Sequence, residues 1–250
     1  MPFYPMSDLK DKLEKYFMFS RTEVKDLIIT ILILAFIVSF KEWGAKEFDI
    51  LIGMRNLFNA VLIMTLVVLV HISAQRIAGL HVGIRVEYKL WWLGLVLGLI
   101  FVFVSRGNVW LLIPGGIVFH HMAVHRIGYF RYGINMLTMS SISLMGALAN
   151  IMFAIVFKIL FMFFPNNMLI EKAIFVSLWF AVFSMLPIPP LDGSKVFFNS
   201  RGVYVLLFGC VLGAALMLSL QINILLAIIG ALLVGVLFWV YYLKVFEGVF

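Results

Sequence analysis

Two distant stretches of the chain carry polar side chains inside strongly apolar sequence, and their residue types are those of a metal site. The first is His71-Ile-Ser-Ala-Gln75, and the second ends a proline-rich segment at Asp192. His71 and Gln75 are four residues apart, so on a helix they share one face. A polar side chain in apolar surroundings is costly without a partner, so we expect these groups to contact one another or a metal ion.

The order of three motifs along the chain carries a family resemblance. After the His71 stretch come Gly146-Ala-Leu-Ala-Asn150 and Met185-Leu-Pro-Ile-Pro-Pro-Leu-Asp-Gly193, each on or after an apolar run. In this order they resemble the site-2 protease family of intramembrane zinc metalloproteases. In that family, H-E-x-x-H supplies two zinc ligands and a general base, and the Asp of a P-x-x-P-L-D-G stretch supplies the third ligand. Pro187 and Pro190 match that stretch, whereas Ala147 replaces the proline of the family's G-P-x-x-N motif.

The first motif departs from the family at two positions. Ile72 occupies the general-base position, and Gln75 occupies the position of the second His ligand. Ile72 cannot accept a proton, and an amide oxygen is a weaker zinc ligand than imidazole. The resemblance therefore implies a degenerate, pseudoprotease-like site without a cofactor, in which His71 or Gln75 is hydrogen-bonded to Asp192. The alternative is zinc at His71 and Asp192, with Gln75 as a weak third ligand.

The resemblance also implies a groove for transmembrane or extended segments of other proteins. The positions expected to contact such a segment are Asn150, Ser184, Pro187 and Pro190. Asn150 could instead bridge helices, which is the commoner role of Asn in a membrane helix. The alternation of apolar residues over 81–88 predicts a β-strand beside the site, which could pair with an extended peptide or be only a connector.

Composition excludes an ordinary soluble domain. Of 250 residues, 64% are hydrophobic and only 12% are charged. The net charge of +7 comes from basic residues at the ends of apolar stretches, which fits positive-inside anchoring and not nucleic-acid binding. The single cysteine, Cys210, excludes a disulfide framework and a thiolate cluster.

The apolar runs predict an all-α polytopic membrane protein with a small β-strand insertion. Its single membrane domain covers 27–243, between an amphipathic segment over 1–26 and a tail over 244–250. Residues 90–119, which Pro114-Gly-Gly116 interrupts, are either a pair of crossings or one re-entrant hairpin. The other predicted spans are 27–40, 57–71 and beyond, 141–164, 173–185, 203–220 and 222–242.

Basic residues near the N-terminus predict its orientation. They place the N-terminus in the cytoplasm and the protein in the cell membrane, with the first motif and Asp192 emerging on one face. We therefore expect a non-catalytic homologue whose partners are the lipid bilayer and other membrane proteins. The alternatives are an active intramembrane zinc metalloendopeptidase with non-standard ligands and a transporter or channel. The sequence lacks the paired broken helices that would favour transport.

Overall fold

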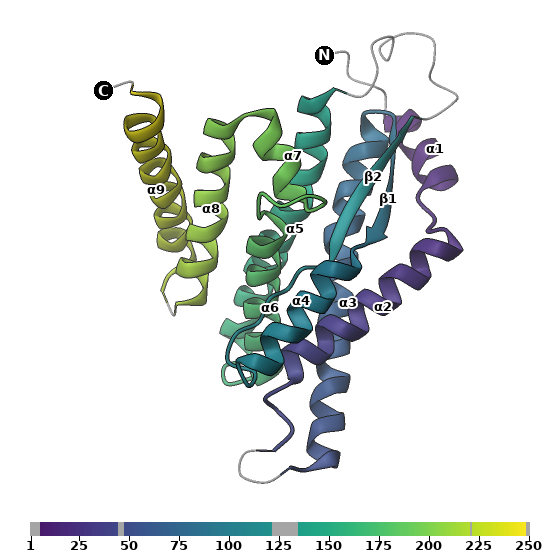
Figure 1. Ribbon diagram of the computed structural model, residues 1–250, viewed down its shortest axis with the longest axis vertical. Helices are drawn as coiled ribbons and strands as arrows, with labels where there is room; N and C mark the ends of the chain where they lie inside the picture. Colours follow the sequence, from purple (N-terminus) through teal and green to yellow (C-terminus); the bar gives the residue numbers. More distant parts are fainter. Residues whose placement is uncertain (1–5, 45–47, 122–134, 221, 249–250) are drawn as a thin grey trace.

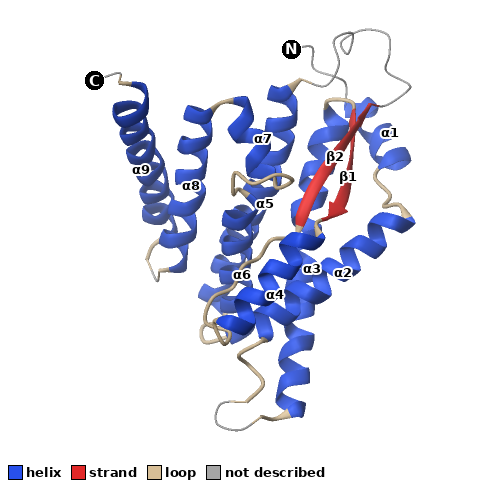
Figure 2. Cartoon of the chain, viewed as in Figure 1, coloured by secondary structure: helices blue, strands red, loops and turns tan. Residues whose placement is uncertain are grey.

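The chain folds into a helical bundle that carries one small sheet (Figures 1 and 2). The computed structural model describes residues 6–44, 48–121, 135–220 and 222–248. The predicted α-helical architecture with a β insertion is confirmed. In chain order the elements are α1 Met6–Tyr16, α2 Arg21–Ser39, α3 Ile50–His81, β1 Ile84–Leu90, α4 Trp92–Val104, β2 Gly115–His121, α5 Met136–Phe163, α6 Met168–Ser184, α7 Asp192–Asn199, α8 Arg201–Ser219, α9 Ile224–Tyr242 and a π-helical turn, Leu243–Glu247.

Four helices in the described part of the chain are long and apolar enough to cross a bilayer. They are α3, α5, α8 and the continuous helix Ile224–Glu247, and about 20 residues are needed for a span. The chain is therefore a multi-pass membrane protein. The predicted span 27–40 lies in α2, whose first turns are charged. The predicted span 173–185 lies in α6, which has 17 residues.

The segment over 90–119 is not a pair of crossing helices. Its first half is α4, of only 13 residues, and its second half is an extended return that ends in β2. The return lies against α4, since a Cβ added at Gly98 would be 2.7 Å from the carbonyl oxygen of Leu111. Pro114 and the two glycines after it prevent a second helix, because proline lacks an amide donor and glycine disfavours helix. The alternative of two crossing helices is therefore wrong. The segment leaves the end of β1 as α4 and returns in extended conformation to pair with β1.

The two strands form a two-stranded antiparallel sheet, although α4 lies between them in the chain. Helix α2 covers the outer edge of β1. The register runs from Ile84 opposite His121 to Leu90 opposite Gly115. The outward amide of Tyr88 donates to Glu23 Oε1 at 2.9 Å, and that of Leu90 donates to Asp26 Oδ2 at 3.4 Å. An edge strand presents unpaired amides and carbonyls, and α2 accepts hydrogen bonds from two such amides of β1. Within the described residues, helix α2 does not bond to β2.

A buried ion pair joins the N-terminal segment to α3. Ser20 and Glu23 form a capping box that opens α2, and the Glu23 carboxylate also pairs with Arg76 of α3. Arg76 Nη1 donates to the carbonyl oxygens of Phe17 and Met18 at 2.9 and 3.1 Å. A buried charge needs such a paired and hydrogen-bonded environment. The pair therefore holds the α1–α2 connection against the helix that carries the first motif.

Candidate functional site

The structure brings His71, Gln75 and Asp192 together. His71 and Gln75 share one face of α3, and Asp192 is the first residue of α7. His71 Nε2 lies 2.9 Å from Asp192 Oδ2, and Gln75 Nε2 lies 2.8 Å from the same oxygen. All three side chains are buried, with at most 4% of each residue exposed. The carboxylate therefore accepts two donors from α3 in surroundings closed to solvent.

Helix α5 supplies the next contacts to the same network. Asn150 Nδ2 lies 3.2 Å from His71 Nδ1, and Gln75 Nε2 donates to the carbonyl oxygen of Ser143 at 3.2 Å. With Asn150 donating to Nδ1, the imidazole carries its proton on Nε2 and donates it to Asp192. Asn150 thus bridges α5 to α3 through His71, while its role toward a bound segment stays a prediction.

The close approach of α5 to α3 depends on a glycine. A Cβ added at Gly146 would lie 2.4 Å from His71 Nε2 and 2.7 Å from Gln75 Nε2. No real Cβ tolerates such contacts, so any larger residue would have to displace the network. On another side the Phe180 ring packs against the imidazole in a T-shaped pair, with ring centroids 5.2 Å apart. The glycine of the second motif therefore makes room for the polar cluster.

The start of α7 places Asp192 with little freedom. A Cβ added at Gly193 would lie 1.9 Å from the carbonyl oxygen of Met185, so the Asp-Gly pair packs directly against the end of α6. Lys195, one turn later, has its Nζ 3.6 Å from Asp192 Oδ1. Burial by itself raises the pKa of Asp192, but the hydrogen bond from His71 and the charge of Lys195 outweigh it and lower that pKa. Asp192 is therefore an ionised acceptor.

A small cavity of about 10 Å³ lies between this cluster and the two-stranded sheet. It has room for about one water molecule. Tyr88 and residues 114–117 were not predicted to belong to the site, yet they line the cavity. Tyr88 donates its hydroxyl to the carbonyl oxygen of Pro114 at 2.9 Å, which ties the two strands together there. The Pro114-Gly-Gly116 sequence could have indicated that this segment belongs to the site, because Gly116 allows the close backbone approach to Pro190.

The donor set does not fit a catalytic zinc site. The atoms of His71, Gln75 and Asp192 are 2.8–3.2 Å apart, close to the separation of about 3.3 Å that zinc bonds of 2.0–2.1 Å set in a tetrahedron. Their chemistry differs, because the described residues contain no cluster of three His, Cys, Asp or Glu side chains. Ile72, at the base position, is a 2% exposed part of the apolar core.

The other predicted contact residues lie around the site without joining the network. The Ser184 hydroxyl donates to the carbonyl oxygen of Ala181 in its own helix at 2.9 Å. Pro187 and Pro190 are exposed in the loop before α7. The carbonyl oxygen of Pro190 would be 2.1 Å from a Cβ at Gly116, so this loop packs against the start of β2. Binding of a segment by these residues stays a prediction.

Comparison with known proteins gives a family. A protein of Methanocaldococcus jannaschii, named as a candidate zinc metalloprotease, is 32% identical over 185 residues. The match covers 72% of this chain and 85% of that protein. No protein-family model matches the chain, and no solved structure matches it.

Proposed function

The chain belongs to the zinc metalloprotease-like family of this archaeal relative, and we propose that it is a catalytically degenerate, site-2-protease-like member. In this proposal it binds transmembrane or extended segments of other membrane proteins without cleaving them. The observation that carries the proposal is the closed hydrogen-bond network of His71, Gln75 and Asp192 beside the buried Ile72. In this network His71 Nε2 and Asp192 Oδ2, two atoms that a metal would otherwise bind, are hydrogen-bonded to each other.

Ile72 at the general-base position supports the part of the proposal that the protein does not hydrolyse peptides. Zinc hydrolysis needs a group that takes a proton from the attacking water, and loss of general-base catalysis removes about 10²–10⁴-fold in rate. The next carboxylate along the chain after His71 is Glu87, on β1. It is engaged at the protein surface with Arg85 at 2.8 Å and His120 at 3.4 Å. It is therefore not a substitute base.

The edge of β2 that α2 does not cover supports the binding role. Because the amide of Tyr88 points away from β2 toward Glu23, its partner Ile117 also turns its amide and carbonyl outward in an antiparallel ladder. Residues 115–117 line the site cavity and pack beside the loop that carries Pro190. An extended segment that added to this edge would run past the polar cluster.

Orientation is part of the proposal. We place the N-terminus in the cytoplasm of a cell whose plasma membrane holds the protein, because basic residues cluster in and after α1. In Figure 1, α1 and α7 lie toward the same end of the bundle. The proposed binding site would then face the cytoplasmic half of the membrane. Protease protection of an N-terminal tag in sealed vesicles tests this orientation.

Metal analysis and cleavage assays on the purified chain test the proposal. We expect substoichiometric zinc after loading and dialysis, and no cleavage of membrane peptides. The double variant Ile72→Glu, Gln75→His should regain zinc, because it restores the family's ligands and base. Adding Asp192→Ala to that variant should remove the zinc again. Stoichiometric zinc together with Asp192-dependent cleavage by the unmodified chain would overturn the degenerate assignment.

A cross-linking experiment tests the binding role separately. A photoreactive residue at the exposed Val118 of β2 should capture a synthetic membrane peptide with an extended flank. The same residue at Lys89, an exposed position on the covered strand β1, is the matched control. Equal capture at the two positions, or none at Val118, would argue against binding along β2.

A further inference from the structure

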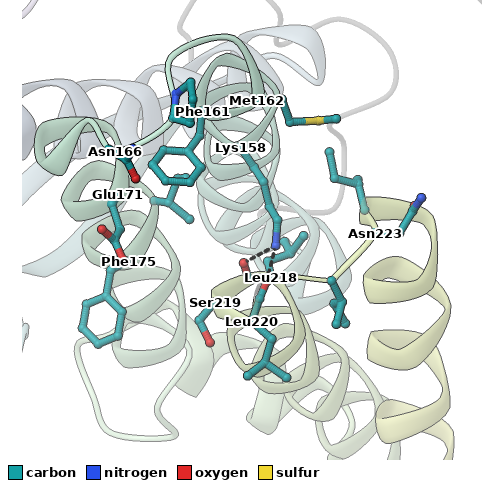
Figure 3. Close-up of a pocket in the computed structure, with 14 residues that line it drawn as sticks. Lys158, Phe161, Met162, Asn166, Glu171, Phe175, Leu218, Ser219, Leu220 and Asn223 are labelled. Atoms are coloured by element: carbon teal, nitrogen blue, oxygen red, sulfur yellow. Dashed lines mark hydrogen bonds between the residues drawn. The ribbon is translucent and has the colours of Figure 1, made fainter.

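A second cavity (Figure 3) lies at the connection between α8 and α9, toward the opposite end of the bundle from α7 (Figure 1). Its volume is about 570 Å³, within the roughly 300–1,000 Å³ usual for ligand sites. It is formed where α5 gives way to α6 and where α8 turns into α9. Its walls are mostly apolar, with a few polar side chains: Lys158, Asn166, Glu171, Ser219 and Asn223.

Lys158 places a cation at this cavity from within a membrane-spanning helix. Its Nζ donates to the carbonyl oxygens of Leu218 and Leu220 at 2.7 and 2.6 Å (Figure 3). These carbonyls end α8, so the lysine caps that helix. An ammonium has three donors, and two are used here. No ion pair among the described residues includes Lys158, so one donor and the whole charge remain for an anion.

Glu171 lines the same cavity from the first turn of α6. Its carboxylate makes no ion pair with Lys158 or with another residue in the described part of the chain. In Figure 3 it lies on a different wall from the Lys158 ammonium. The cavity therefore presents a positive and a negative group that are separated from each other. A ligand with both charges would complement them.

The apolar walls indicate that this ligand is a lipid. Met162 is 72% exposed and Leu220 is 52% exposed, although both line the cavity. Asn166 and Asn223 lie at the helix ends, where a bilayer gives way to its head-group region. A soluble phosphate compound would leave the apolar walls uncovered. A phospholipid would cover them with acyl chain while its head group reached Lys158.

We propose that this cavity binds a membrane phospholipid whose head group carries a phosphate and a primary amine. A phosphate oxygen accepts the third N–H of Lys158, and the amine of the head group donates to the Glu171 carboxylate. The acyl chains lie along Phe161, Met162 and Leu220. The site is separate from the His71 cluster, and it does not depend on whether that cluster is catalytic.

Lipid titrations of the purified chain test the proposal. Native mass spectrometry of the protein released from micelles would compare phosphatidylethanolamine, phosphatidylcholine and phosphatidylglycerol. Lys158→Gln should weaken binding of phosphatidylethanolamine about tenfold, the usual scale for one charge-assisted hydrogen bond. Glu171→Gln should weaken phosphatidylethanolamine alone, to the level of phosphatidylcholine. Lys25→Gln, which removes an exposed charge on α2 away from this cavity, is the control and should leave binding unchanged.

A second variant separates lipid binding from the capping of α8. Met162→Trp fills the cavity without touching the carbonyls that Lys158 caps, and it should lower phosphatidylethanolamine binding at least about fivefold. Inorganic phosphate at millimolar concentration should not displace the lipid. The proposal is overturned if the three lipids bind equally. It is also overturned if free phosphate competes, or if folded Lys158→Gln and Met162→Trp proteins bind like the unmodified chain.

Discussion

The His71 cluster and the Lys158 cavity solve the same problem in opposite ways. Each holds a charged side chain inside an apolar bundle, where an unpartnered charge is expensive. Asp192 is surrounded by donors from α3 and α7 beside a cavity of about 10 Å³. Lys158 reaches only backbone carbonyls and borders a cavity of about 570 Å³.

The difference separates stabilisation from binding. A polar group whose partners are all internal contributes to stability and has little left for a ligand. A charge with no opposite charge beside an open cavity can contribute to binding instead. His71, Gln75 and Asp192 thus form the more closed of the two sites. The following variants test this contrast, from the largest expected effect to the smallest.

Asp192→Leu should have the largest effect on stability. It leaves the donors of His71 and Gln75 buried without their shared acceptor, which we expect to cost about 3 kcal/mol or more. Thermal unfolding in detergent measures this change. Ser194→Ala, one turn into the same helix, removes a local bond to Leu191 and should cost much less. An unchanged melting temperature for Asp192→Leu would show that the network does not stabilise the fold.

Gly146→Ala should destabilise the chain by about 2 kcal/mol, because the new methyl group would overlap the His71 imidazole. Gly230→Ala is the matched control, since its Cβ would meet only the flexible side chain of Met217 at 3.3 Å. That control should be neutral or slightly stabilising, as alanine favours helix. Equal effects in the two unfolding curves would contradict the close approach of α5 to α3.

Lys158→Met should cost about 1 kcal/mol, because two carbonyls at the end of α8 lose their cap. Lys158→Arg keeps the charge and is the comparison. Phosphatidylethanolamine should raise the unfolding temperature of the unmodified chain and not that of Lys158→Met, since a ligand stabilises only the state that binds it. A lipid effect of the same size in both proteins would remove the contrast between the sites.

Lowering the pH should have the smallest effect on the stability of the fold. The pKa of Asp192 is lowered in the folded state, so its contribution to stability is present above the ordinary value of 3.8 and is lost as the pH falls below it. Unfolding temperatures measured across this range should fall more for the unmodified chain than for Asp192→Asn, which has no carboxylate to protonate at this position. Parallel pH curves for the two proteins would argue against the network as drawn.

Sequence reasoning reached the site residues but not their surroundings. The spacing of His71 and Gln75 placed them on one helix face, and the resemblance of the stretch ending at 192–193 to a family motif added Asp192. The contact of Gly146 with the imidazole and the buried pairing of Arg76 with Glu23 were not predicted. Both join residues more than 50 positions apart, so no local pattern announces them.

The strand β2 shows the same limit in the fold. Residues 109–119 are apolar enough for a membrane span, and periodicity does not separate a short buried strand from a short helix. Residues 115–121 form a strand because β1 supplies their hydrogen-bond partners. The Pro-Gly-Gly stretch before and within this strand disfavours a helix. The open cavity at Lys158 likewise exists only because four helix ends meet around it.

The amino-acid order alone determined that this chain is a membrane helical protein in which His71 and Gln75 share one helix face beside Ile72. Those properties follow from composition and from spacing along a helix. Tertiary structure alone decided that His71 and Gln75 meet Asp192 in a buried cluster while Lys158 borders a larger cavity. The reason is that satisfaction of a buried polar group depends on which distant backbone and side chains packing brings within hydrogen-bond reach.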